Sequence, residues 1–198
     1  HYCSNTLTNE SMFDNTLYAI KKAKANNVVI SFDVNLRQQL WHELTLLPDR
    51  VEACIKRSDI IKLSKDEAEY LAKIRQMDVA AYINYILSLG AKLIVITDGE
   101  NAAQVTCASF SVMLDVPKIS PIDTTGAGDS FISGFLFFLA QLVNDNKSTK
   151  TLVDIIEQRE KVSAAVLFAA KCGAFTCQKK GAFTALPKIT DLAKERDV

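Results

Sequence analysis

Short apolar runs that alternate with longer helical patterns constrain this fold most. Three runs rich in branched aliphatic residues are predicted strands: Val28–Phe32, Asp59–Leu63 and Leu93–Thr97. Between them lie segments whose apolar residues recur at helical spacing. This alternation is typical of a parallel sheet covered by helices on both faces. The sequence therefore predicts an α/β fold with a mostly parallel sheet flanked by helices.

The remaining pattern completes one domain. Two shorter alternating strands are predicted at 103–107 and 109–114, and a polar loop at 144–150. No linker, repeat or low-complexity segment interrupts residues 1–198, so we expect a single α/β domain. Helices are predicted at 9–26 (capped by Asn9 or Ser11), 48–57, 65–73, 78–89, 127–143, 148–158 and 160–175.

Composition narrows the classes of protein. Lys plus Arg equals Asp plus Glu at 23 each, so no overall field attracts nucleic acid. The longest apolar run, Phe131–Val143, is shorter than a bilayer span, which predicts a buried helix and no membrane association. The five cysteines show no CxxC spacing, which favours reduced thiols in a cytoplasmic protein.

The start of the chain resembles the end of a core strand. Residues Tyr2–Asn5 follow His1 directly, and no Met precedes them. We therefore expect the polypeptide to extend upstream, so that this chain is an N-terminally truncated form of a longer protein.

The segment at 121–131 carries the strongest chemical signal, with the sequence PIDTTGAGDSF. Gly126 and Gly128 flank a small Ala127, so the backbone can approach an anion closely. A helix that begins here aims its free N–H groups and positive dipole end at that anion. Asp129, in the first turn, is placed to accept a proton from a hydroxyl that attacks a bound phosphate.

Other nucleotide motifs do not fit this segment. It lacks the GK[ST] of a P-loop, and Phe131 stands where a GxGxxG fingerprint needs its third glycine. Nicotinamide binding is thereby disfavoured. A turn that only joins a strand to a helix is the simpler structural alternative for a bare GxG.

The stretch DTTGAGDSF at 123–131 resembles the C-terminal signature of the ribokinase-like (PfkB-type) carbohydrate kinases. The resemblance implies that the amides of Gly126, Ala127 and Gly128 bind the transferring phosphate. It implies that Asp129 contacts the sugar hydroxyl as general base. It also places Asp123 and Thr125 near the nucleotide phosphates and, in some members, a monovalent cation such as K⁺.

Further segments match the family in order. Asp33-Val34-Asn35-Leu36-Arg37 resembles the DxNxR of the fructokinase branch, where Asn35 and Arg37 would bind the substrate. A strand-end turn is the structural alternative. Ser64-Lys65-Asp66-Glu67 resembles the NxxE motif, in which Glu67 would help hold hydrated Mg²⁺. A helix cap formed by Ser64 and Glu67 is compatible with that role.

Two more matches concern the nucleotide. Thr97-Asp98-Gly99 resembles the TxG turn beside its phosphates, although Ala102 replaces a final glycine and a simple strand-to-strand turn is the alternative. The 172–187 segment resembles the C-terminal helix and loop beside adenine, which assigns Gly173 to the nucleotide site and Cys172 to packing.

Taken together, the resemblance implies a kinase that transfers the γ-phosphate of ATP to a sugar hydroxyl, with fructose favoured. The alternatives are ribose, a nucleoside or 2-keto-3-deoxygluconate as acceptor, and a non-catalytic nucleotide-binding fragment. ATP and Mg²⁺ are the implied cofactors, and a homodimer stays open. The resemblance covers the whole chain as the later two thirds of such an enzyme, without the N-terminal strands and lid.

Overall fold

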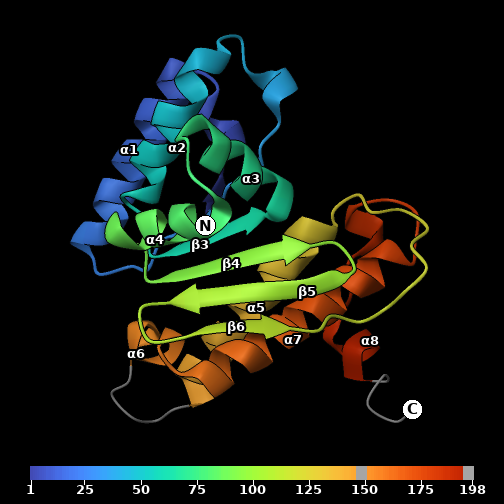
Figure 1. Ribbon diagram of the computed structural model, residues 1–198. Coiled ribbons are helices and arrows are strands. Elements are labelled where there is room, and N and C mark those ends of the chain that lie inside the picture. Colours follow the sequence, from blue (N-terminus) through green and yellow to red (C-terminus); the bar gives the residue numbers. More distant parts are fainter. Residues whose placement is uncertain (146–150, 194–198) are drawn as a thin grey trace. The chain divides into compact units, whose positions relative to one another are not determined.

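The computed structural model describes residues 1–145 and 151–193, and within them a six-stranded sheet (Figure 1). Its order follows the sequence, and the pairs β1/β2, β2/β3 and β3/β4 are parallel. Figure 1 draws β5 running opposite to β4, so the sheet is mixed. The predicted α/β class with flanking helices is confirmed. The strands are β1 (Tyr2–Cys3), β2 (Ser31–Asp33), β3 (Ile60–Ser64), β4 (Leu93–Asp98), β5 (Asn101–Cys107) and β6 (Ser111–Leu114).

Two of the predicted strands are shorter in the structure. The run at 28–32 becomes regular only at Ser31, because the Ile30 N–H donates to the Asp59 side chain over 2.8 Å instead of to a neighbouring strand. The predicted strand at 2–5 ends at Cys3, where the chain turns into a 3₁₀ helix over Ser4–Leu7.

By its internal contacts the chain divides into two compact units. The first contains His1–Asp98 and Gln104–Val112, and the second contains Gly99–Ala103 and the residues from Met113 onward. The single domain predicted for 1–198 stays a prediction. Helices of the first unit are α1 (Glu10–Ala25), α2 (Leu47–Ile55), α3 (Lys65–Ile74) and α4 (Val79–Ser88).

The first unit has one apolar core. Phe32 of β2, Leu63 of β3 and Ile94 of β4 are almost fully buried, together with Leu47 of α2 and Ile86 of α4. The predicted start of α1 is confirmed, since the Asn9 side chain accepts the Met12 N–H. Parallel strands buried on both faces need nearly continuous apolar runs, which explains why β3 and β4 were recognisable in the sequence.

Helices dominate the second unit: α5 (Ala127–Asp145), α6 (Leu152–Ile156), α7 (Arg159–Cys177) and α8 (Ile189–Ala193). Phe135 and Leu139 of α5 and Val166 of α7 are fully buried. The helix predicted at 148–158 begins with residues outside the described ranges, and its described part is α6. The predicted loop at 144–150 also lies outside them, except that α5 continues to Asp145.

Helix α5 is longer than the apolar run from which it was predicted. Its window Ala127–Asn144 is long and apolar enough to cross a membrane by length and composition alone. The length argument against a membrane span is therefore wrong. One side of α5 nevertheless packs on α7 within the unit: Gly134 lies against Cys172, and the rings of Phe137 and Phe138 lie against Phe168. The absence of membrane association stays a prediction.

Candidate active site

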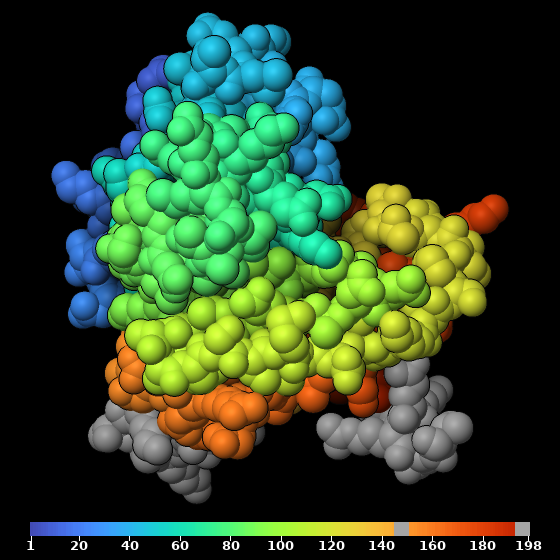
Figure 2. All heavy atoms as spheres, in the orientation of Figure 1, coloured from blue at the N-terminus to red at the C-terminus, as the bar shows by residue number. Residues whose placement is uncertain are grey.

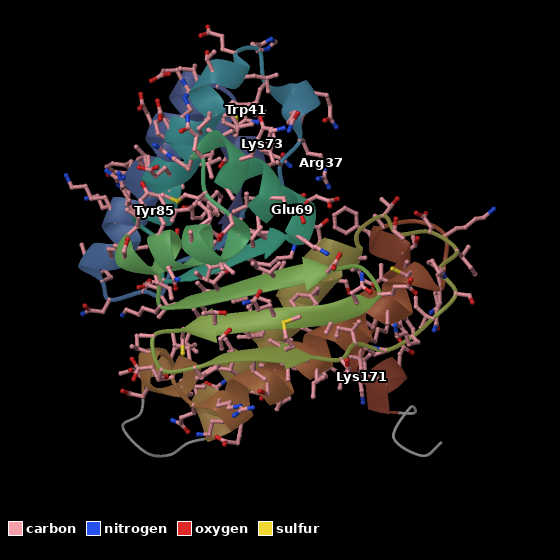
Figure 3. The ribbon with its side chains drawn as sticks, viewed as in Figure 1. Arg37, Trp41, Glu69, Lys73, Tyr85 and Lys171 are labelled. Carbon is pink, nitrogen blue, oxygen red and sulfur yellow. The ribbon has the colours of Figure 1, made fainter. Side chains whose placement is uncertain are left out.

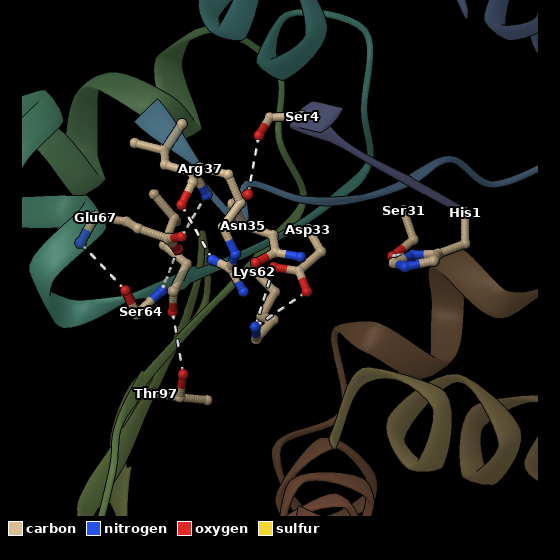
Figure 4. A network of polar contacts seen from close by, with 12 residues as sticks. His1, Ser4, Ser31, Asp33, Asn35, Arg37, Lys62, Ser64, Glu67 and Thr97 are labelled. Atoms are coloured by element: carbon tan, nitrogen blue, oxygen red, sulfur yellow. Dashed lines mark hydrogen bonds and ion pairs between the residues drawn. The ribbon is translucent and has the colours of Figure 1, made fainter. Parts of the chain in front are cut away.

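The loop that follows β2 carries the predicted substrate residues, and several polar contacts fix it (Figure 4). Asp33 is buried and faces the Lys62 ammonium, with Nζ–Oδ distances of 3.0 and 3.1 Å. The Val34 N–H donates to the Lys62 carbonyl over 2.9 Å. Asn35 has φ +34°, in the left-handed region that few non-glycine residues adopt. Arg37 is exposed, and its guanidinium donates to the Leu36 carbonyl (Figure 3).

Glu67 lies at the start of α3 and binds two backbone amides. One carboxylate oxygen accepts the Ser64 N–H over 2.8 Å, and the Ser64 side chain accepts the Glu67 N–H, which completes a capping box. The other oxygen accepts the Leu36 N–H over 2.6 Å. The helix-cap alternative is thus confirmed, and it leaves room for the metal role that the sequence predicts.

The residues near Glu67 fit a hydrated Mg²⁺ better than a protein cage. Each of its carboxylate oxygens accepts one hydrogen bond, which leaves lone pairs for waters of a hydration shell. Over residues 1–145 and 151–193, no group of three or more His, Cys, Asp or Glu side chains gathers at metal-binding distance. Mg²⁺ is often held by one or two carboxylates, waters and substrate phosphates, and this donor set fits that pattern.

The end of β4 holds the predicted nucleotide turn. Thr97 pairs with Ser64 in the sheet register, and its hydroxyl is 3.5 Å from the Leu63 carbonyl. Asp98 forms an ion pair of 3.0 Å with Lys65. Gly99 has φ +54° in the short connection to β5. The strand-to-strand turn is therefore present, and the nucleotide role of Thr97 and Gly99 stays a prediction.

The predicted phosphate turn is held by Asp123. Its carboxylate accepts the Thr125 N–H over 2.9 Å and the Gly181 N–H over 3.0 Å. These hydrogen bonds from Gly181 and Thr125 lower the pKa of Asp123 to about 2. Asp123 thus ties the turn to the loop after α7. Most of residues 121–125 is exposed, and the yellow segment containing them forms part of the visible surface (Figure 2).

Glycine is required at the centre of this turn. Gly126 has φ +80°, and a Cβ there would lie 3.4 Å from both the Cα and the Cβ of Ala182. α5 begins at the next residue, so its first N–H groups have no acceptor within the helix. The Ala127 N–H, however, donates to the Thr124 carbonyl over 3.2 Å. A phosphate bound as predicted would share or replace the hydrogen bond between Ala127 and Thr124. Gly128 follows within the first turn of α5.

Asp129 has an exposed carboxylate in the first turn of α5. Within the described part of the chain, no hydrogen bond or ion pair engages it. An ionised carboxylate near a helix N-terminus is stabilised by the dipole. The group is therefore available to accept a proton.

Next to Asp129, α5 is joined to α7 by buried contacts that the sequence did not predict. The Ser130 hydroxyl donates to the Cys172 carbonyl over 3.0 Å, and the Thr176 hydroxyl donates to Ser130 over 2.9 Å. A Cβ on Gly173 would lie 3.3 Å from the Ala127 carbonyl, so the glycine permits this close approach. Gly173 thereby has a packing role, and its predicted nucleotide contact is untested.

The prediction that Cys172 is a packing residue agrees with its surroundings. Cys172 is buried, and burial raises the pKa of its thiol to about 11. The thiolate is therefore disfavoured near neutral pH.

Lys62 is the functional candidate that sequence reasoning missed, and its signal was a lone charge within the apolar strand β3.

Comparison with known proteins places this geometry in a family. Residues 2–189 match the pfkB family of carbohydrate kinases. A fructokinase of Vibrio alginolyticus is 34% identical over 194 residues, which are 98% of this chain and 59% of the relative. Fructokinase-2 of Zea mays is 33% identical over 192 residues, or 96% of this chain and 53% of the relative. The chain thus spans between half and three fifths of these relatives.

Solved structures give the same result. The fructokinase of Xylella fastidiosa with bound ATP superposes with a TM-score of 0.90 at 28% identity, over 99% of this chain and 61% of that one. A fructokinase variant of Vibrio cholerae, in its fructose-, ADP- and potassium-bound form, gives 0.84 at 29% identity, over 97% and 58%. The aminoimidazole riboside kinase of Salmonella enterica gives 0.84 at 26% identity, over 100% and 62%. From the motifs and these matches, the chain belongs to the pfkB family of carbohydrate kinases.

Proposed function

We propose that this chain is part of an ATP-dependent kinase that transfers the γ-phosphate of ATP to a hydroxyl of fructose. The observation that carries the proposal is the exposed carboxylate of Asp129 in the first turn of α5, directly after the glycine turn. Phosphoryl transfer needs positioned amides for the phosphate and a base for the attacking hydroxyl. The similarity to fructokinases supports the substrate.

The catalytic roles follow from the chemistry of each residue. Asp129 binds the sugar hydroxyl and accepts its proton, while the amides of Gly126, Ala127 and Gly128 hold the transferring phosphate. These amides stabilise the charge that develops on the phosphate oxygens. Asn35 and Arg37 bind the sugar through an amide and a guanidinium.

The remaining roles concern the nucleotide and its ions. Thr97, Gly99, Thr125 and Gly173 line the nucleotide in this proposal. Glu67 holds Mg²⁺ through water, and the ion neutralises the phosphates when it is bound. Asp123, whose hydrogen bonds keep it ionised, contributes to a monovalent-cation site. A Vibrio cholerae fructokinase with bound potassium supports K⁺ as that cation.

The partners in this proposal are small molecules. ATP and a sugar are expected, in a cytoplasmic homodimer that binds neither nucleic acid nor membrane. The equal numbers of acidic and basic residues support the expected lack of nucleic-acid binding, because they give no net charge for steering polyanions.

A nucleoside-like acceptor is the second candidate. The similarity to an aminoimidazole riboside kinase favours it, since that structure matches the whole of this chain. The two candidates share Asp129 and the glycine turn and differ only in the acceptor.

The test is steady-state kinetics on the full-length protein with ATP and a panel of fructose, ribose, nucleosides and 2-keto-3-deoxygluconate. Asp129→Asn keeps the size of the side chain but removes the base, so we expect kcat to fall about 10²–10⁴-fold. The KM for ATP should stay nearly unchanged. Asp115→Asn, at an exposed aspartate of the same unit, is the matched control.

Three results would count against the proposal. Turnover of Asp129→Asn close to that of the wild type removes Asp129 from its role. Preference for a nucleoside over fructose selects the second candidate. Nucleotide binding without turnover of any acceptor favours a non-catalytic module.

A further inference from the structure

Glu67 bridges two segments that are distant in the sequence. Its contact with Ser64 is local to the start of α3, but its contact with Leu36 joins a residue 31 positions away. Leu36 stands between Asn35 and Arg37, the two proposed sugar ligands. A metal role alone gives no reason for a carboxylate oxygen to accept that amide.

The amide that Glu67 binds belongs to the peptide unit directly after Asn35. The Asn35 carbonyl accepts the Ser4 hydroxyl over 3.1 Å, and the next amide along the chain is the Leu36 N–H bound by Glu67. Both the carbonyl oxygen and the N–H of the peptide unit between Asn35 and Leu36 are therefore hydrogen-bonded. Asn35 has φ +34°, in the left-handed region, and the two hydrogen bonds hold the peptide that follows it.

We infer that Glu67 is a positioning residue for the sugar-binding loop, in addition to its proposed place near Mg²⁺. The inference rests on the proposed function. A charge-assisted hydrogen bond to the Leu36 amide holds the backbone between Asn35 and Arg37 before any metal or nucleotide arrives. The Glu67 side chain thereby connects the sugar-binding loop to the start of α3 (Figure 4).

The metal role and the positioning role predict different behaviour without metal. If Glu67 acts only on Mg²⁺, its loss leaves sugar affinity unchanged in the presence of EDTA and the absence of nucleotide. If Glu67 positions the loop, sugar affinity falls under the same conditions.

The variant Glu67→Gln separates the two roles in the full-length protein. Glutamine keeps the length but replaces one of the two acceptor oxygens by an NH₂ donor, so the Leu36 and Ser64 amides cannot each keep an oxygen in its present position. We expect calorimetry in EDTA to show a Kd for fructose about tenfold higher than that of the wild type. Hydrogen exchange should show faster exchange at the Leu36 amide by a similar factor.

Glu69→Gln is the matched control, because Glu69 is an exposed residue of the same helix and undergoes the same chemical change (Figure 3). It should bind fructose and exchange at Leu36 as the wild type does. If Glu67→Gln fails to fold, Glu67→Asp retains the charge near the metal but shortens the reach to Leu36. It should then show the same loss of fructose affinity in EDTA.

The outcomes are distinguishable. Wild-type fructose affinity in EDTA together with unchanged Leu36 exchange in the Glu67 variants overturns the inference and leaves the proposed function standing. Absence of binding to any sugar by the wild type removes the proposed function, and the inference about sugar affinity falls with it. Faster Leu36 exchange with weaker fructose binding supports both.

Discussion

The loop after β2 and the turn before α5 differ in how many of their carboxylates are engaged. In the loop, the carboxylates themselves carry the structure: Asp33 faces a buried ammonium and Glu67 binds two backbone amides. In the turn, one carboxylate carries the structure and the other is left without a partner among the described residues. Asp123 ties the turn to the loop after α7, and Asp129 stays exposed.

This difference suggests a division of labour between binding and proton transfer. A loop that selects a sugar benefits from rigid, satisfied polar groups, because their geometry is then fixed before binding. A general base must keep its lone pairs free for the substrate hydroxyl. Close packing of α5 on α7 fixes the backbone at Asp129 without using its carboxylate. Variants that remove one of these contacts at a time test this difference between the loop and the turn.

The largest effect on stability is expected at Lys62. Lys62→Met removes the cation that the buried Asp33 faces, and breaking a buried pair from one side costs about 3–5 kcal/mol. Urea unfolding of the full-length protein measures the loss. Lys73→Met, at an exposed lysine of α3, is the control and should change stability by less than about 0.5 kcal/mol.

A double variant tests whether the loss comes from the charge. Asp33→Asn combined with Lys62→Met removes both charges, so it should recover part of the stability lost by Lys62→Met alone. A double variant no more stable than Lys62→Met would show that the loss does not come from the unpaired charge of Asp33.

A smaller effect is expected where α5 meets α7. A Cβ on Gly134 would lie 2.6 Å from the Cys172 Sγ and 3.4 Å from the Ala169 Cα. Overpacking outweighs the better helix propensity of alanine, so Gly134→Ala should destabilise by about 1–2 kcal/mol. Ser133→Ala, at an exposed neighbour, is the control.

Cys172→Ala provides the rescue. It removes the sulfur that the new methyl group meets, so the Gly134→Ala/Cys172→Ala pair should lose less than the sum of the single variants. Strict additivity would mean that the helices separate to accept the methyl group. The second half of the comparison, positioning of Asp129 by close packing, would then be wrong.

The smallest effect depends on pH and concerns Asp123. Its pKa is about 2 in the folded chain, below the ordinary value of about 3.9 for an unfolded aspartate. The ionised Asp123 carboxylate, with its hydrogen bonds to Thr125 and Gly181, therefore stabilises the fold above about pH 4. This contribution is lost as the pH falls toward 2. The difference in unfolding free energy between wild type and Asp123→Asn should shrink over that window.

Unfolding midpoints in urea at a series of pH values measure this difference. Asp115→Asn, at an exposed aspartate of the same unit, should track the wild type throughout. If the difference in unfolding free energy between the wild type and Asp123→Asn stays the same between about pH 5 and pH 2, the ionised Asp123 carboxylate does not stabilise the turn.

The sequence alone determined the features that depend on local pattern. The apolar runs of β3 and β4 and the cap at Asn9 were predictable because their signals lie within a few residues of each other. The glycine turn before α5 was predictable for the same reason: two glycines and an aspartate at a helix start form a compact signature. The α/β class and the family resemblance followed from these elements.

Tertiary structure decided which polar groups are engaged. The partner of Asp123 at Gly181 lies 58 residues away, and the partner of Glu67 at Leu36 lies 31 residues away. Spacing along the chain carries no signal for such pairs, because only the folded backbone brings their atoms within hydrogen-bonding distance. For the same reason the sequence identified the candidate acidic residues of the site, whereas only the fold separated the carboxylates that hold loops from Asp129, which remains free to react.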